Sequence, residues 1–217
     1  MMEINLDNWF KPELDRNKLK DLSQRKDLPG LIHFFFYFLF LFISGYLAYI
    51  TWGTWWSLFF FFIYGTIYAF SVANWHETVH RTAFKTRWIN EIFYHTSSFM
   101  CDFEGFRWRW SHTFHHTYTL QTEGDYDHEI QISRPTELFW FFLNYIPFTD
   151  LLYPHRLIKY EVLKHAFGKL APVVNISVPK NQKKKIIWNS RLYVLIWINI
   201  FVFSFYIGSI LPILYII

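Results

Sequence analysis

Charged residues are absent from two long stretches of the sequence. Residues 28–75 and 192–217 contain no Asp, Glu, Lys or Arg, and only 18% of the whole chain is charged, against 24% aromatic. A soluble domain has nearer a quarter of charged residues. Because one helical crossing of a bilayer needs about 20 apolar residues, the first stretch is long enough for two crossings and the second for one. This distribution indicates an integral membrane protein.

Cysteine is almost absent as well. Cys101 is the only one in the chain, which excludes a disulfide framework and a metal site built from several thiolates. The net charge is +4, but no basic motif is interleaved with aromatic residues in the manner of nucleic-acid binding, so nucleic acid is excluded as a partner. All Lys and Arg residues lie in 1–27 or in 81–191, and the positive-inside rule therefore predicts that these segments face the cytoplasm.

The predicted fold is an all-α integral membrane protein made of one domain over residues 1–217. A transmembrane hairpin is followed by a histidine-rich helical region and a third span, where Gly208, Ser209 and Pro212 indicate a turn and the possible start of a fourth. The predicted segments are a cytoplasmic lead at 1–27, spans at 31–51 and 55–73, a cytoplasmic and interfacial region at 74–190 with an interfacial helix at 138–153, and a span at 191–217.

Two histidine motifs stand in the region between the second and third spans. His76 and His80 are spaced i, i+4, and His112, His115 and His116 are spaced i, i+3, i+4. On a helix, each motif would present its imidazoles on one face, and neutral imidazole is a good ligand for iron, copper and zinc. In a chain with this many histidines, the first spacing is expected by chance about 0.5 times and the second about 0.02 times. The motifs therefore favour a metal site over the alternative of unrelated surface or interfacial histidines.

The residues around both motifs resemble the first two histidine boxes of membrane fatty acid desaturases. The first reads HETVHRTAFKTRW at residues 76–88, and the second reads RWRWSHTFHHT at residues 107–117. The resemblance covers roughly residues 30–217. It implies two irons held by histidines, activation of O2, and removal of two hydrogens from a fatty acyl chain. The metal ligands it implies here are His76, His80, His112, His115 and His116.

The same resemblance has one large departure. Desaturases carry a third box of the H-x-x-H-H type after a fourth span, and no such motif follows His116 in this sequence. Three spans also leave no complete return crossing that would bring further ligands to the cytoplasmic side. We therefore expect the sequence to be C-terminally incomplete, with five histidines that hold one metal or part of a pair.

Four further residues are candidates for supporting roles. Glu77 and Asp125 are candidate acceptors that orient ligating imidazoles, the alternative being solvent-facing acids. Arg107 and Arg109 are candidates to bind the carboxylate or phosphate of an acyl headgroup, the alternative being interfacial anchors. His95 lies among aromatic residues and is interpreted as a packed histidine and not a ligand.

The leading functional hypothesis is an O2-dependent acyl-chain desaturase of lipid metabolism. Its substrate would be lipid-, CoA- or carrier-linked, and an external donor of the ferredoxin, rubredoxin or cytochrome b5 type would supply electrons. One alternative is another histidine-box enzyme, such as an alkane, carotenoid or sterol hydroxylase or ketolase. Another is a non-catalytic, truncated relative. The bacterial plasma membrane and the endoplasmic reticulum both fit the sequence.

Overall fold

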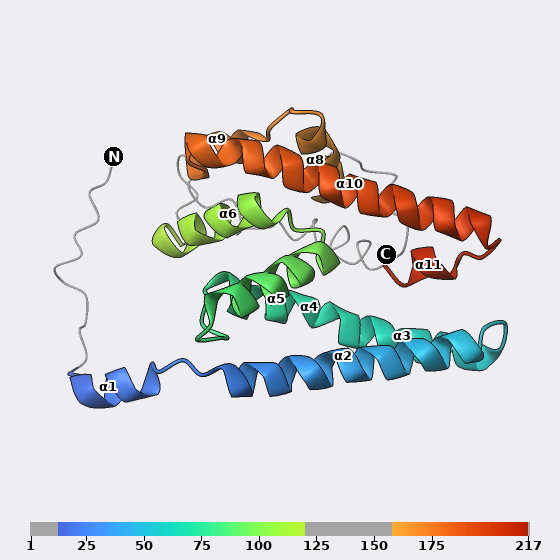
Figure 1. The fold of residues 1–217 in the computed structure, drawn as a ribbon, viewed down its shortest axis with the longest axis horizontal. Coiled ribbons are helices and arrows are strands. Elements are labelled where there is room, and N and C mark those ends of the chain that lie inside the picture. The colour runs from blue at the N-terminus through green and yellow to red at the C-terminus, as the bar shows by residue number, and fades with distance from the viewer. Residues whose placement is uncertain (1–12, 120–157, 217) are drawn as a thin grey trace, which may run out of the picture.

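The computed structural model describes residues 13–119 and 158–216, and within these ranges the chain is helical and contains no strand. The all-α fold predicted from the sequence is thereby confirmed. Asp125 and the helix predicted at 138–153 lie outside the described residues. The elements, shown in Figure 1, are α1 (Arg16–Leu22), α2 (Asp27–Ile50), α3 (Trp55–Ala69), α4 (Ser71–Val79), α5 (Arg87–Met100), α6 (Gly105–Thr117), α8 (Ile158–Ala166), α9 (Pro172–Ser177), the 3₁₀ turn η5 (Lys180–Gln182), α10 (Lys183–Tyr206) and α11 (Leu211–Leu214).

Three helical segments are long and apolar enough to cross a membrane, as the sequence predicts. They are Asp27–Ile50, Trp55–Val79 and Lys180–Tyr206, of 24, 25 and 27 residues. At 1.5 Å per residue, the shortest spans about 36 Å, which exceeds a hydrocarbon core of about 30 Å. Most of their large apolar side chains are exposed, which is the surface expected of helices that face lipid.

Helices α2 and α3 form an antiparallel hairpin, joined by residues 51–54 (Figure 1). Gly53 adopts φ +84°, a left-handed conformation that glycine accepts without steric cost, and this lets the chain reverse tightly. Trp52 and Trp55 are exposed at this turn. Tryptophan is enriched at membrane–water interfaces, so the turn fits one end of a transmembrane hairpin.

Two of the candidate spans begin earlier than the sequence predicts. Helix α2 begins at Asp27 and includes Pro29 and Gly30 in its first turn, because proline is tolerated where the backbone N–H needs no helical partner. A Cβ atom at Gly30 would lie 2.5 Å from the carbonyl oxygen of Ala83, so glycine here permits close packing and does not interrupt the helix. Helix α10 begins at Lys183, since lysine side chains can extend from a helix end toward water.

The C-terminal residues turn back onto the hairpin, at the place where the sequence predicts a turn. Gly208 has φ +62°, and α11 follows it (Figure 1). The hydroxyl of Tyr215 donates to the carbonyl oxygen of Gly45 at 2.7 Å. The hydroxyl of Tyr64 donates to the backbone carbonyl oxygen of Tyr215 at 2.8 Å. These bonds join the end of the third span to the first two spans.

Candidate metal centre

The first histidine motif lies on α4, which continues the rod of α3 after a slight break at Phe70. His76 is within the helix and His80 caps its end, one turn further on. The span predicted at 55–73 ends before His76, whereas the candidate span in the structure, Trp55–Val79, includes His76 in its last turns. The same helical segment therefore holds both imidazoles at one end of the hairpin of candidate spans.

The second motif lies on α6, and Glu104 sets the start of this helix. The carboxylate of Glu104 accepts hydrogen bonds from the backbone N–H groups of Phe106 at 3.2 Å and Arg107 at 2.7 Å. It thereby satisfies two of the donors that a helix N-terminus leaves free. The helix continues for 13 residues to Thr117 and carries the three histidines on its last two turns.

Four of the five predicted ligands come together. One ring nitrogen of each of His76, His80, His112 and His116 lies within 4.8 Å of the others. The Nε2 atom of His112 is 3.0 Å from that of His80 and 3.1 Å from that of His116. This group does not include His115, whose ring centroid lies 5.7 Å from that of His112. In Figure 1, α4 continues from α3 away from the turn between α2 and α3.

The position of His112 depends on an aromatic layer behind it. Trp75, on α4, is buried and contacts the His112 ring edge to face at a centroid distance of 5.1 Å. Phe103 and Trp108 pack on the same tryptophan, and they stack on each other at 4.1 Å. The two helices that carry the histidines are therefore joined by a packed apolar cluster and not by the imidazoles alone.

The surroundings of His80 favour the neutral form of its imidazole. Burial, together with the neighbouring rings of His112, His116 and His76, lowers the pKa of His80 to about 4. At neutral pH one ring nitrogen of His80 therefore carries no proton, and the lone pair of this nitrogen is available to a metal.

The predicted supporting residues are placed as follows. Glu77 is exposed, with a carboxylate oxygen 3.6 Å from Nδ1 of His76, beyond ordinary hydrogen-bond length. Arg107 is buried and pairs with Glu161 of α8, with 2.7 Å between Nε and Oε1. Arg109 pairs with Glu91 of α5 at 2.8 Å. The structure thus places both arginines in internal ion pairs.

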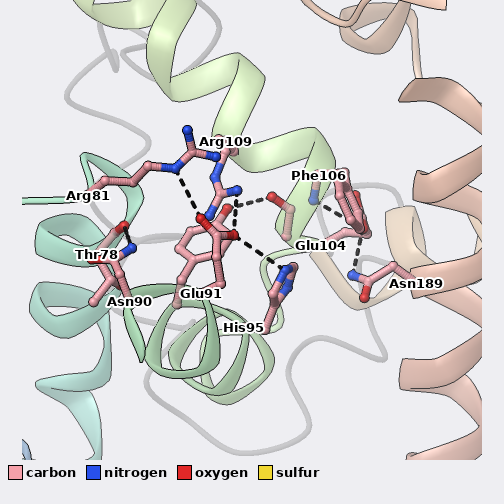
Figure 2. Close-up of polar contacts among 11 residues, drawn as sticks. Thr78, Arg81, Asn90, Glu91, His95, Glu104, Phe106, Arg109 and Asn189 are labelled. Carbon is pink, nitrogen blue, oxygen red and sulfur yellow. Dashed lines mark hydrogen bonds and ion pairs between the residues drawn. The ribbon is translucent and has the colours of Figure 1, made fainter. Parts of the chain in front are cut away.

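Glu91 is a residue that the sequence reasoning did not single out. It contacts Arg81 as well as Arg109, and His95, one turn further along α5, is packed against Phe106 and lies 3.9 Å from the Glu91 carboxylate (Figure 2). The packed role predicted for His95 agrees with this position. The signal in the sequence was an acidic side chain directly before the apolar run Ile92, Phe93 and Tyr94, because a charge on a packed helix needs a partner.

Glu104 should make the stability of the protein depend on pH. It is 1% exposed and also accepts a hydrogen bond from the side-chain amide of Asn189 on α10 (Figure 2). Burial raises its pKa from 4.5 to about 7, against the opposing effect of these hydrogen bonds. The folded state then holds the proton more tightly than the unfolded state, so stability falls as pH rises from about 4.5 to about 7.

Replacing Glu104 with glutamine should remove this dependence. The Glu104→Gln chain should unfold like the wild type at pH 5 and gain stability relative to it at pH 8, by up to about 3 kcal/mol. Thermal unfolding in detergent across this pH range measures the difference. Glu13→Gln, the same change in an exposed side chain, is the control. Parallel pH profiles for the Glu104→Gln and wild-type chains would contradict the prediction.

Comparison with known proteins agrees with this geometry. A family model described as "Fatty acid desaturase" matches residues 53–217, which contain both histidine motifs and two of the three candidate spans. No curated protein and no solved structure matches the chain. The matched range is more than half of the 217 residues. The chain therefore belongs to the fatty acid desaturase family.

Proposed function

We propose that this protein is an acyl-chain desaturase whose convergent imidazoles hold iron next to a membrane. The observation that carries the proposal is the group of four histidine nitrogens, all within 4.8 Å of one another, at the end of a candidate membrane-spanning helix. Membership of the desaturase family supports iron as the metal and a fatty acyl chain as the substrate.

The spacing of the imidazoles fits a shared metal. Two nitrogens bound to one ion at about 2.1 Å lie about 3.0 Å apart when the angle between them is 90°. The Nε2 atom of His112 stands at 3.0 and 3.1 Å from those of His80 and His116. Imidazole also suits iron, because it is a borderline ligand that binds without a thiolate. The nitrogen ligands, and the separations of His112 from His80 and from His116, therefore agree with one iron position shared by these three histidines.

A second iron, which the family implies, would need additional ligands. His115 is the candidate from this chain, because it lies on the same helix with its ring centroid 5.7 Å from that of His112. Five imidazoles cannot complete two coordination spheres, so further donors would have to join His115. We propose the di-iron arrangement on this basis.

An open apolar groove supports an acyl substrate. It has a volume of about 530 Å³ and runs along the break between α3 and α4, from Phe70 past Ala73 to His76. One end of this groove is on a candidate membrane span, and the other is at a candidate metal ligand. An alkyl chain that enters from the lipid could lie along the groove and bring a methylene group to the histidines.

The protein's own residues would hold the metal, orient its ligands and shield the site from water. His76, His80, His112 and His116 would bind the metal through one ring nitrogen each, and Trp75 would shield the inner side of His112 from water. When bound, the iron supplies the O2 chemistry that removes two hydrogens from adjacent methylene groups, with electrons from an external ferredoxin, rubredoxin or cytochrome b5 type of donor.

We also propose that the histidine end faces the cytoplasm. Helix α1, with its basic residues, lies at the end opposite the turn between α2 and α3, as do α6 and the start of α10 with its three lysines (Figure 1). Basic residues next to a span favour the cytoplasmic side. Labelling, from outside intact cells, of a cysteine placed at Thr54 in the opposite turn tests this assignment.

Lipid analysis of cells that express the chain tests the reaction. Mass spectrometry should find acyl chains that have lost two hydrogens in cells with the wild-type chain and none in cells with the His112→Ala chain. A gain of one oxygen would instead identify a hydroxylase. Unchanged lipids, with both chains present in the membrane at equal amounts, would contradict catalytic function.

A further inference from the structure

The carboxylate of Glu91 lies between two arginines, Arg81 and Arg109, and contacts both (Figure 2). Oε1 of Glu91 accepts a hydrogen bond from Nε of Arg81 at 3.0 Å, and Oε2 accepts one from Nη1 of Arg109 at 2.8 Å. Arg81 directly follows His80 in the first motif. Arg109 precedes His112 by three residues, about one turn of α6. Each arginine is therefore next to one of the two histidines whose Nε2 atoms lie 3.0 Å apart.

The backbone of Arg81 indicates that its side chain is needed there. Arg81 has φ +59°, a left-handed conformation at the end of α4 that usually belongs to glycine. A residue with a side chain pays roughly 1 kcal/mol for it. Its N–H donates to the carbonyl oxygen of Thr78 at 3.0 Å, which any residue could do. Only the hydrogen bond from the Arg81 side chain to Glu91 would be lost if glycine stood at this position.

The contacts on the α5 side are equally well defined. The guanidinium carbon of Arg109 lies 3.8 Å above the ring of Tyr94, which is fully buried and donates its hydroxyl hydrogen to the carbonyl oxygen of Gly105. Asn90, the neighbour of Glu91, donates its amide to the carbonyl oxygen of Thr78 at 2.8 Å. Adjacent residues of α5 therefore contact the end of α4 and the first turns of α6.

The charges of the two arginines match the carboxylate. Partial burial of Glu91 works against its ionisation. The hydrogen bonds and positive charges of Arg109 and Arg81 outweigh this burial, and they lower the pKa of Glu91. Glu91 is therefore ionised at neutral pH and holds both guanidinium groups by charge-assisted hydrogen bonds.

We propose that Glu91 is a positioning residue for the metal centre, which ties Arg81 to Arg109 and so fixes His80 relative to His112. The inference rests on the proposed metal-binding function and adds to it a residue that touches neither metal nor substrate. Residues that orient ligands from outside the coordination sphere typically change metal affinity by 10- to 100-fold when they are replaced.

Cobalt binding by the full chain in detergent tests the role. Co²⁺ is added to the metal-free protein, and its dissociation constant and visible absorption spectrum are recorded with the melting temperature of the metal-free chain. Glu91→Gln should weaken Co²⁺ binding by about 10-fold or more and shift the absorption bands, because the amide cannot accept from both arginines. A change of spectrum reports ligand geometry, which a general loss of stability would not alter.

Two variants of Arg81 separate positioning from folding. Arg81→Gly removes the ion pair and relieves the backbone, so the melting temperature should stay level or rise while Co²⁺ affinity falls. Arg81→Lys keeps the charge and should recover much of the affinity. Glu161→Gln is the matched control, because it removes an ion pair to Arg107 of the same helix, α6. It should lower the melting temperature without changing the Co²⁺ spectrum.

The outcomes are distinct. Wild-type affinity and spectrum in the Glu91→Gln and Arg81→Gly chains would overturn the inference alone. Equal losses of affinity in Glu161→Gln and Glu91→Gln would also overturn it, since any ion pair to α6 would then suffice. If the wild-type chain itself binds no Co²⁺, the proposed metal centre fails, and the inference fails with it.

Discussion

Replacing His112 with alanine is expected to abolish metal binding, with a loss of affinity of more than about 100-fold. His112 is the central ligand of the four, because its Nε2 atom is within 3.1 Å of both His80 and His116. It is also the one buried member of the group, at 4% exposed. Its removal takes away a donor that solvent cannot easily replace and leaves His116 as the one member of the group that α6 supplies.

Titration with Fe²⁺ under anaerobic conditions, and with Co²⁺, measures this effect. His112→Gln accompanies the alanine variant, because glutamine keeps much of the side-chain volume against Trp75 and separates loss of a ligand from loss of packing. His165→Ala is the control, since His165 is a buried histidine on α8 outside the group of four. The metal centre would be refuted if His112→Gln and the wild type bound Fe²⁺ with equal affinity.

Much of the fold follows from where charge is missing. The two uncharged runs predict three membrane-crossing helices, and the structure confirms three candidates. Helix ends are less predictable, because they depend on what a side chain meets in space. Pro29 and Gly30 look like a break in the sequence, yet Gly30 is in a helix that needs its small size against Ala83.

The candidate site was predictable only as far as local spacing determines it. Spacings of i+3 and i+4 both place a histidine near the face of His112, so the sequence alone cannot separate His115 from His116. The position of α4 decides between them: it lies where His116 joins His76 and His80. Long-range ion pairs such as Arg81–Glu91 leave even less trace, because the pairing depends on a left-handed backbone at Arg81.

Loss of the Arg107 side chain is expected to have the second large effect, on stability and not on metal binding. Arg107 is 6% exposed, its Nε lies 2.7 Å from Oε1 of Glu161, and its guanidinium carbon lies 4.0 Å above the ring of Trp108. Arg107→Ala would leave Glu161 with an uncompensated charge in a partly buried place. Breaking such a pair costs about 3 kcal/mol, which corresponds to roughly 6–12 °C in melting temperature for a chain of this size.

Thermal unfolding in detergent checks the prediction, and a second substitution shows its cause. Glu161→Gln in the Arg107→Ala chain should restore part of the lost stability, because it removes the charge left behind. Arg87→Ala, an exposed arginine on α5, should change the melting temperature little. The alternative role of Arg107, binding an acyl headgroup, predicts the reverse pattern: an unchanged melting temperature with a raised KM for the acyl substrate. The two measurements together therefore decide whether Arg107 serves the fold or the substrate.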